Sequence, residues 1–368
     1  SNTLAMRYFS EGVNRPYYWL ERKSDMGIRY FTSNYIGDVI ELSETALWKA
    51  EYLVTQEEYS EALDWIICAY RAARHISRTP SLIFEQYAAL KLKHITLDEL
   101  YKILLNADLP AEALSEYQDK LSNEFEKDRY VPDYSLEDIR LKDKIERLFW
   151  NNKNNTGRIS LRAAKYYFGI IQCLDMKDDY KFSHVYKVKK CDLMDEADQL
   201  CQIQQQLQEK LPWELEYDMQ QQVKEYKDLV NNRATRFYWR SNTEKDPLKY
   251  LYKHYNLKNK TSALIAVLAI QRYQKERGRF PDGLEGLIAQ GYLANMPGDY
   301  FSQDQPLLYK ELSKDKFVLY SRGYDFKDNS GLRKADEAVD DADIVYWPPE
   351  LPKPIIHKPK NVTAGLQQ

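Results

Sequence analysis

Glycine is scarce in this chain of 368 residues. Its 13 glycines are about half of the ~7% share that is usual in proteins. A glycine-rich loop that cradles phosphate groups is therefore excluded over most of the length. No H-E-x-x-H, G-x-S-x-G or P-loop pattern is present either, so the motifs give no positive support to an enzyme. The five histidines are scattered, and each is expected to be a surface or capping residue rather than a ligand: His75, His94, His184, His254 and His357.

The sequence also lacks an apolar run long enough to cross a membrane. The longest run, from 263 to 270, has eight residues, whereas a membrane-spanning helix needs about 20. No signal peptide is visible, and the sequence starts at Ser1 rather than Met. We therefore expect that any native leader or membrane anchor has been removed ahead of residue 1.

Cysteine is equally rare, with only Cys68, Cys173, Cys191 and Cys201. No two of them form a C-x-x-C pair, which argues against a zinc knuckle or a thioredoxin-like site. On one helix, Cys191 and Cys201 would lie about 15 Å apart, too far for a disulfide. We expect buried free thiols.

Neither sign of charge dominates the chain. The 53 Lys and Arg residues nearly balance the 56 Asp and Glu residues, for a net charge of −3, and the two signs are interspersed. Nucleic-acid-binding proteins typically carry a basic stripe. No nucleic-acid partner is therefore expected.

Helical periodicity is what the chain has in abundance. From residue 41 to 255, apolar side chains recur at intervals of three and four, as in Ala62, Leu63 and Ile66. Thr55 and Glu58 have the spacing of a capping box and predict a helix start. We predict an all-helical domain over 41–255, an array of antiparallel helices with no sheet of more than two short strands. The breaks fall at three prolines: Pro80, Pro110 and Pro212.

Three other segments stand out. Residues 1–40 are rich in aromatic side chains and are predicted to form an irregular segment packed on the body. Leucines spaced by seven at 193, 200 and 207 predict a packed amphipathic helix over 190–211, with dimerisation as the alternative. Residues 348–368 hold five of the 14 prolines and are expected to form an extended strap or a disordered tail.

The C-terminal third has a different pattern. A helix from Ala263 to Gly278 is followed by a short helix that bears Leu284, Leu287 and Ile288. Strands are predicted at 307–309, 317–320 and 344–347, the first two joined as a hairpin. The predicted fold class is therefore mainly α with a small α+β C-terminal module.

These residues carry a resemblance. The strings RYQKERGRFPDGLEGL, PLLYK, FVLYSRGYDFKDNSG and DDADIVYW occur in order within residues 256–347. This segment resembles the globular domain of the major pseudopilin of type II secretion, and is similar to the C-terminal unit of uncharacterised membrane-anchored planctomycete and verrucomicrobial proteins. About 260 mostly polar residues precede it in place of the pilin membrane helix. The resemblance implies a location outside the cytoplasm more strongly than it implies a role in secretion.

The resemblance also implies a calcium site. In that family a calcium ion ties the turn of the S-x-G-x-D motif to the acidic ending, and the matching residues here are Asp325, Asp340, Asp341 and Asp343. Calcium takes 6–8 oxygen ligands in tolerant geometry, which suits such a set. The alternative is a solvated acidic loop whose aspartates pair with the basic residues of the same loop: Lys327, Arg333 and Lys334.

The sequence therefore predicts a non-enzymatic structural or protein-interaction protein of the bacterial periplasm or cell envelope, whose full-length form would be anchored in the membrane. The alternative is an enzyme with a cleft in the helical domain lined by Tyr, Asp and His. Convergent, buried titratable groups in a cleft would favour the enzyme, and a shallow groove of aromatic and Gln side chains would favour binding.

Overall fold

The computed structural model describes residues 3–16, 34–78, 81–128, 131–149, 188–232, 235, 248–303, 305–331 and 343–349. The chain is mainly α with a small α+β module at its C-terminal end, which confirms the predicted fold class. In the described part of 41–255 all the regular elements are helices, as predicted.

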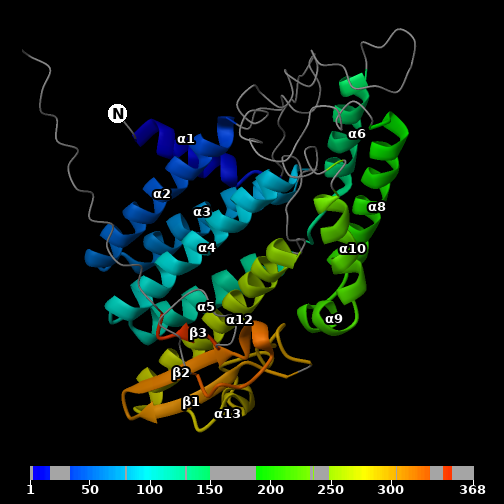
Figure 1. The fold of residues 1–368 in the computed structure, drawn as a ribbon. Helices are drawn as coiled ribbons and strands as arrows, with labels where there is room; N and C mark the ends of the chain where they lie inside the picture. Colours follow the sequence, from blue (N-terminus) through cyan, green and yellow to red (C-terminus); the bar gives the residue numbers. More distant parts are fainter. Residues whose placement is uncertain are drawn as a thin grey trace, which may run out of the picture.

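Within the described residues, five helices form the N-terminal part of the molecule (Figure 1). Their bounds are α1 (Thr3–Val13), α2 (Asn34–Thr55), α3 (Tyr59–Arg78), α4 (Ile83–Asn106) and α5 (Ala111–Glu126). On α3 the predicted apolar face is buried, with Leu63 and Ile66 almost inaccessible to solvent. Because α2, α3 and α4 each bury such a face against a neighbour, they pack side by side in one layer.

Two details of this region differ from the sequence-based predictions. Residues 3–13 are helical rather than irregular, and Met6, Phe9 and Val13 pack on the body with residues of α2 and α3. Thr55 is the last residue of α2 rather than the start of a helix, and its hydroxyl donates to the carbonyl of Tyr52 (2.6 Å). Residues 17–33 lie outside the described part of the chain.

A second group of helices has a core of its own. It consists of α6 (Ser135–Phe149), α8 (Lys190–Gln208), α9 (Pro212–Tyr217) and α10 (Gln220–Asn231). The predicted helix over 190–211 is confirmed as α8, and its leucine stripe packs against α6 and α10 of the same chain. The predicted loop over 151–157 lies outside the described residues.

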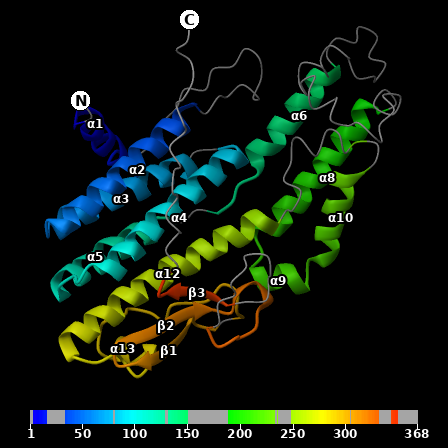
Figure 2. The ribbon, with the colours of Figure 1, turned by 60° about the vertical axis from the view of Figure 1, so that its left-hand side comes forward.

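The long helix α12 (Leu248–Arg277) joins the parts (Figure 2). Leu248 and Leu251 belong to the core of the second group, whereas Tyr250 and the buried apolar residues from Leu257 onward belong to the main core. The predicted domain boundary between 255 and 256 therefore falls inside one continuous helix. The main core runs without a break from α2–α5 through α12 into the C-terminal module.

A three-stranded antiparallel sheet completes the fold. Its strands are β1 (Leu308–Ser313), β2 (Lys316–Ser321) and β3 (Ile344–Trp347), in that order across the sheet, and the short helix α13 (Leu284–Ala289) precedes them. Tyr309 pairs with Leu319, and Tyr320 with Val345. The sheet contacts α12 through β2 and β3, and α12 lies between it and the helical layer (Figure 2).

The apolar run at 263–270 is buried in the middle of this arrangement. All eight of its side chains except the half-buried Ile265 are inaccessible to solvent, and Leu264, Val267 and Leu268 share one core with Phe317 and Leu319 of β2. In the part of the chain that the structure describes, no helix is both long and apolar enough to cross a membrane.

Candidate functional site

A cleft of about 870 Å³ lies between α5, α12 and the loop 291–300. On α12 its lining residues are spaced by three and four from His254 through Lys258 and Thr261 to Ile265, and on α5 Ser122 and Phe125 follow the same spacing. This spacing turns a single face of each helix toward the cleft. The loop 291–300 closes the third side.

The deep end of the cleft holds a buried polar network. Lys93 of α4 forms an ion pair with Asp128 (2.7 Å), and the Tyr70 hydroxyl donates to the same carboxylate (2.7 Å). The Lys93 side chain is 3% exposed. Burial lowers the pKa of Lys93, and Asp128 opposes that effect. Burial, together with the adjacent Asp128 charge, raises the pKa of Tyr70 well above its usual value.

Two basic residues of α12 face the same end. His254 is buried, and burial together with the charges of Lys258 and Lys93 lowers its pKa well below 6.5, so the imidazole is neutral at pH 7. Lys258 is half-buried, and burial lowers its pKa while Asp128 raises it. Its ammonium group lies 5.3 Å from the ring centroids of both Tyr255 and Tyr300.

The opposite end of the cleft is closed by Arg272. Its guanidinium donates to the Ser115 hydroxyl (3.0 Å) and to Gln118 Oε1 (3.3 Å), and it lies 4.6 Å from the centroid of the Tyr292 ring. Gln118 in turn donates to the Tyr292 carbonyl (2.6 Å). These contacts attach the start of the loop 291–300 to both α5 and α12.

Asp299 holds the other end of the loop. Asp299 is 4% exposed and directly follows residues 291–298, which line the cleft. It accepts hydrogen bonds from Asn259 Nδ2 (2.7 Å), Ser321 Oγ (2.7 Å) and the backbone N–H groups of Phe301 (3.0 Å) and Arg322 (3.1 Å). Because four donors satisfy it, the buried carboxylate ties α12, the loop and β2 together. The cleft therefore has a wall fixed at both ends.

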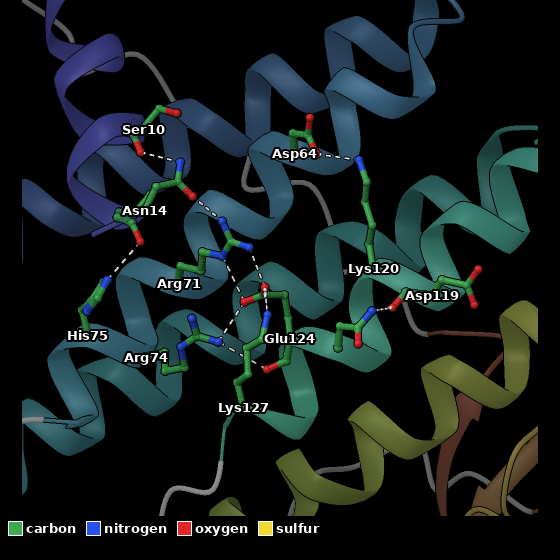
Figure 3. Close-up of polar contacts among 12 residues, drawn as sticks. Ser10, Asn14, Asp64, Arg71, Arg74, His75, Asp119, Lys120, Glu124 and Lys127 are labelled. Carbon is green, nitrogen blue, oxygen red and sulfur yellow. Dashed lines mark hydrogen bonds and ion pairs between the residues drawn. The ribbon is translucent and has the colours of Figure 1, made fainter. Parts of the chain in front are cut away.

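A second polar cluster lies on the other side of α5, around Glu124 (Figure 3). Arg71 donates from Nε to Oε2 (3.0 Å) and from Nη2 to Oε1 (2.5 Å), and Arg74 Nη1 donates to Oε2 (2.8 Å). Arg71 also bonds to Asn14, which follows α1. Burial raises the pKa of Glu124, but the bonds and charges of these arginines outweigh it and lower the pKa to about 2. The cluster holds α1, α3 and α5 together.

The residues predicted to bind calcium are brought together only in part. Asp325 Oδ2 accepts from the side-chain amide of Asn329 (3.0 Å), while Asp343 accepts from the backbone N–H groups of Asn329 (3.2 Å) and Gly331 (2.6 Å). Asp340 and Asp341 lie outside the described residues, as do two of the basic residues of the alternative. Within the described ranges, no three His, Cys, Asp or Glu side chains are grouped so as to hold a metal ion.

Calcium binding at this turn and its alternative, a loop closed by its own polar contacts, both remain predictions, and we favour the alternative. The N–H groups that bond to Asp343 already perform the tethering that an ion would perform, so the described residues fit a turn closed by hydrogen bonds. We expect isothermal calorimetry of the chelator-treated chain to give no binding heat at millimolar Ca²⁺, with an unchanged melting temperature. Binding heat together with a rise in melting temperature would instead support the ion.

Sequence reasoning missed the residues of the cleft. The expectation of a surface or capping role was wrong at the buried His254, whereas the buried His75 bonds to the carbonyl of Val13, the last residue of α1. Cys191 is exposed, whereas Cys68 and Cys201 are buried as expected. One signal was available: Lys93 occupies a position of the buried stripe of α4, between Leu90 and Leu97. A lysine on an apolar helix face needs a partner, which here is Asp128.

Comparisons of the chain with family models, with curated proteins and with solved structures find no match. The fold and the cleft are therefore the basis for a functional proposal.

Proposed function

We propose that this chain is a non-enzymatic interaction protein that works outside the bacterial cytoplasm and binds an extended segment of a protein partner in the cleft along α12. The observation that carries the proposal is the extent of the cleft lining along α12, from His254 to Arg272, beside a loop that is fixed at both ends. The pseudopilin-like motifs of residues 256–347 support the location and a membrane-anchored precursor.

The length of the cleft favours a peptide over a small metabolite. Its lining on α12 extends from His254 to Arg272, a separation of 18 residues. At 1.5 Å per residue the cleft follows the helix for about 27 Å. An extended chain of about eight residues has that length.

The lining also combines apolar surface with hydrogen-bonding groups, which a bound peptide needs. Apolar surface comes from Phe125, Leu257 and Ile265, while the half-buried hydroxyls of Ser122 and Ser262 supply polar contacts. A bound backbone loses its water and requires such donors and acceptors. Side chains of the partner would pack on the apolar positions between them.

A displayed library of random peptides of about twelve residues, long enough to span the cleft, tests the proposal. The matched variants are Ser122→Tyr, which places a ring in the cleft, and Asn123→Tyr, which places the same ring on the neighbouring exposed position of α5 outside it. We expect the unmodified chain and Asn123→Tyr to enrich the same peptides and Ser122→Tyr to lose them. Failure of the unmodified chain to enrich any peptide, or equal enrichment by Ser122→Tyr, would contradict the proposal.

The enzyme remains a second candidate because Tyr70, Lys93, Asp128 and His254 converge at the deep end of the cleft and are largely buried. The two candidates differ in what happens to a bound peptide. After incubation with the chain, mass spectrometry should recover the enriched peptides intact. A cleaved or modified peptide, whose production stops in Asp128→Asn, would favour the enzyme.

A further inference from the structure

Charge is unevenly distributed along the cleft. The deep end contains two ammonium groups, of Lys93 and Lys258, against the single carboxylate of Asp128, and the neighbouring His254 is neutral. Asp128 is already bonded to Lys93 and Tyr70. Among the described residues Lys258 forms no ion pair, and its contacts are the faces of two tyrosine rings. The one carboxylate therefore serves two ammonium groups, and among the described residues Lys258 has no carboxylate paired with it alone.

Two further carboxylates line the cleft, and both belong to α5. Asp119 and Glu126 are exposed on α5, where water screens their charge. Lys258 is half-buried, and its interaction with an incoming charge is screened less. We therefore expect repulsion of a ligand anion by the two exposed carboxylates to be weaker than its attraction to Lys258.

We propose, on the basis of the function proposed above, that the segment bound in the cleft is acidic and that one of its Asp or Glu carboxylates pairs with Lys258 between Tyr255 and Tyr300. The two rings already hold the ammonium group in place, so pairing costs little additional side-chain ordering. The apolar positions farther along the cleft then take the neighbouring residues of the same segment. Lys258 thus selects for acidic partners.

The test compares Lys258→Gln with Lys253→Gln, which removes an exposed charge from the same helix outside the cleft. The displayed library is screened against the unmodified chain, and the enriched peptides are then synthesised with each Glu or Asp in turn replaced by Gln or Asn. We expect the enriched peptides to share an acidic position whose replacement weakens binding about tenfold or more. Lys258→Gln should cause the same loss and abolish the difference between the acidic and neutral peptides, while Lys253→Gln should leave both affinities unchanged.

The outcomes separate the two proposals. Enrichment of peptides without a shared acidic position, or an acidic preference that survives in Lys258→Gln, would overturn the role of Lys258 and leave the peptide-binding cleft standing. Failure to enrich any peptide would overturn the cleft proposal itself. Circular dichroism melting of each variant establishes that the fold is retained. An affinity that decreases with added salt in the unmodified chain and not in Lys258→Gln would give further support.

Discussion

Replacement of Leu268 by aspartate is expected to unfold the chain at room temperature or to lower its stability by more than about 4 kcal/mol. Leu268 is fully buried in the core that α12 shares with the helical layer and with β2. A carboxylate there would lose its water without gaining a partner, and the apolar contacts of the leucine would be lost as well. Domains have total stabilities of about 5–15 kcal/mol, so a cost of this size removes much of the folded population.

Urea unfolding followed by circular dichroism measures this effect. The control is Leu312→Asp, the same substitution at a position of β1 that is 56% exposed, where the change should stay within about 0.5 kcal/mol. An unchanged unfolding transition in Leu268→Asp would mean that α12 does not pack between the helical layer and the sheet.

The second large loss of stability is expected when Glu124 is replaced. Its side chain is 3% exposed and is the shared partner of Arg71 and Arg74, whose own side chain is 8% exposed. Glu124→Gln removes the negative charge and leaves the buried guanidinium of Arg74 and the partly exposed one of Arg71 without it, so we expect a loss of about 3–5 kcal/mol at pH 7. Glu126→Gln, two residues along on the exposed face of α5, serves as the control and should have little effect.

The pH dependence provides an independent check on Glu124. Its pKa in the folded chain is about 2, below the ordinary value of 4.5. The stabilisation from this carboxylate is therefore fully present above pH 4.5 and is lost as the pH falls from 4.5 toward 2, because the unfolded chain binds the proton first. Glu124→Gln should flatten the stability curve in that interval. A curve with the same slope as that of the unmodified chain would show that another group controls the acid response.

Much of the fold could be predicted because it depends on local patterns. The intervals of three and four on α3 and α8, and the strand at 317–320, are visible in short windows of sequence. The errors arose where a local pattern had two interpretations. Thr55 and Glu58 have capping-box spacing, yet α2 continues to Thr55 and the chain turns at Glu57, which has a φ of 62°. The apolar face of α1 consists of only three buried residues, too few for the helical periodicity to be recognised in the sequence.

The cleft could not be predicted in the same way. Lys93, Asp128 and Lys258 come from three segments, and the last two are separated by 130 residues of sequence. Their convergence depends on how α12 packs against α5, which no local pattern specifies. Asp299 was overlooked for a related reason, since its role depends on Asn259 and Ser321 of other elements.

Hydrogen–deuterium exchange of the full chain, with and without an enriched acidic peptide, tests whether the peptide binds in the cleft along α12. The loop 291–300 forms the wall of the cleft, and the backbone N–H groups of 291–293 and of 299–300 are hydrogen-bonded. Between these ends the loop lacks regular secondary structure, so the amides of 294–296 should exchange readily in the free chain. We expect the peptide to slow exchange most strongly in this loop, with smaller changes along 118–128 and 254–272. Protection confined to α8 and α10, with the loop 291–300 unchanged, would contradict this expectation.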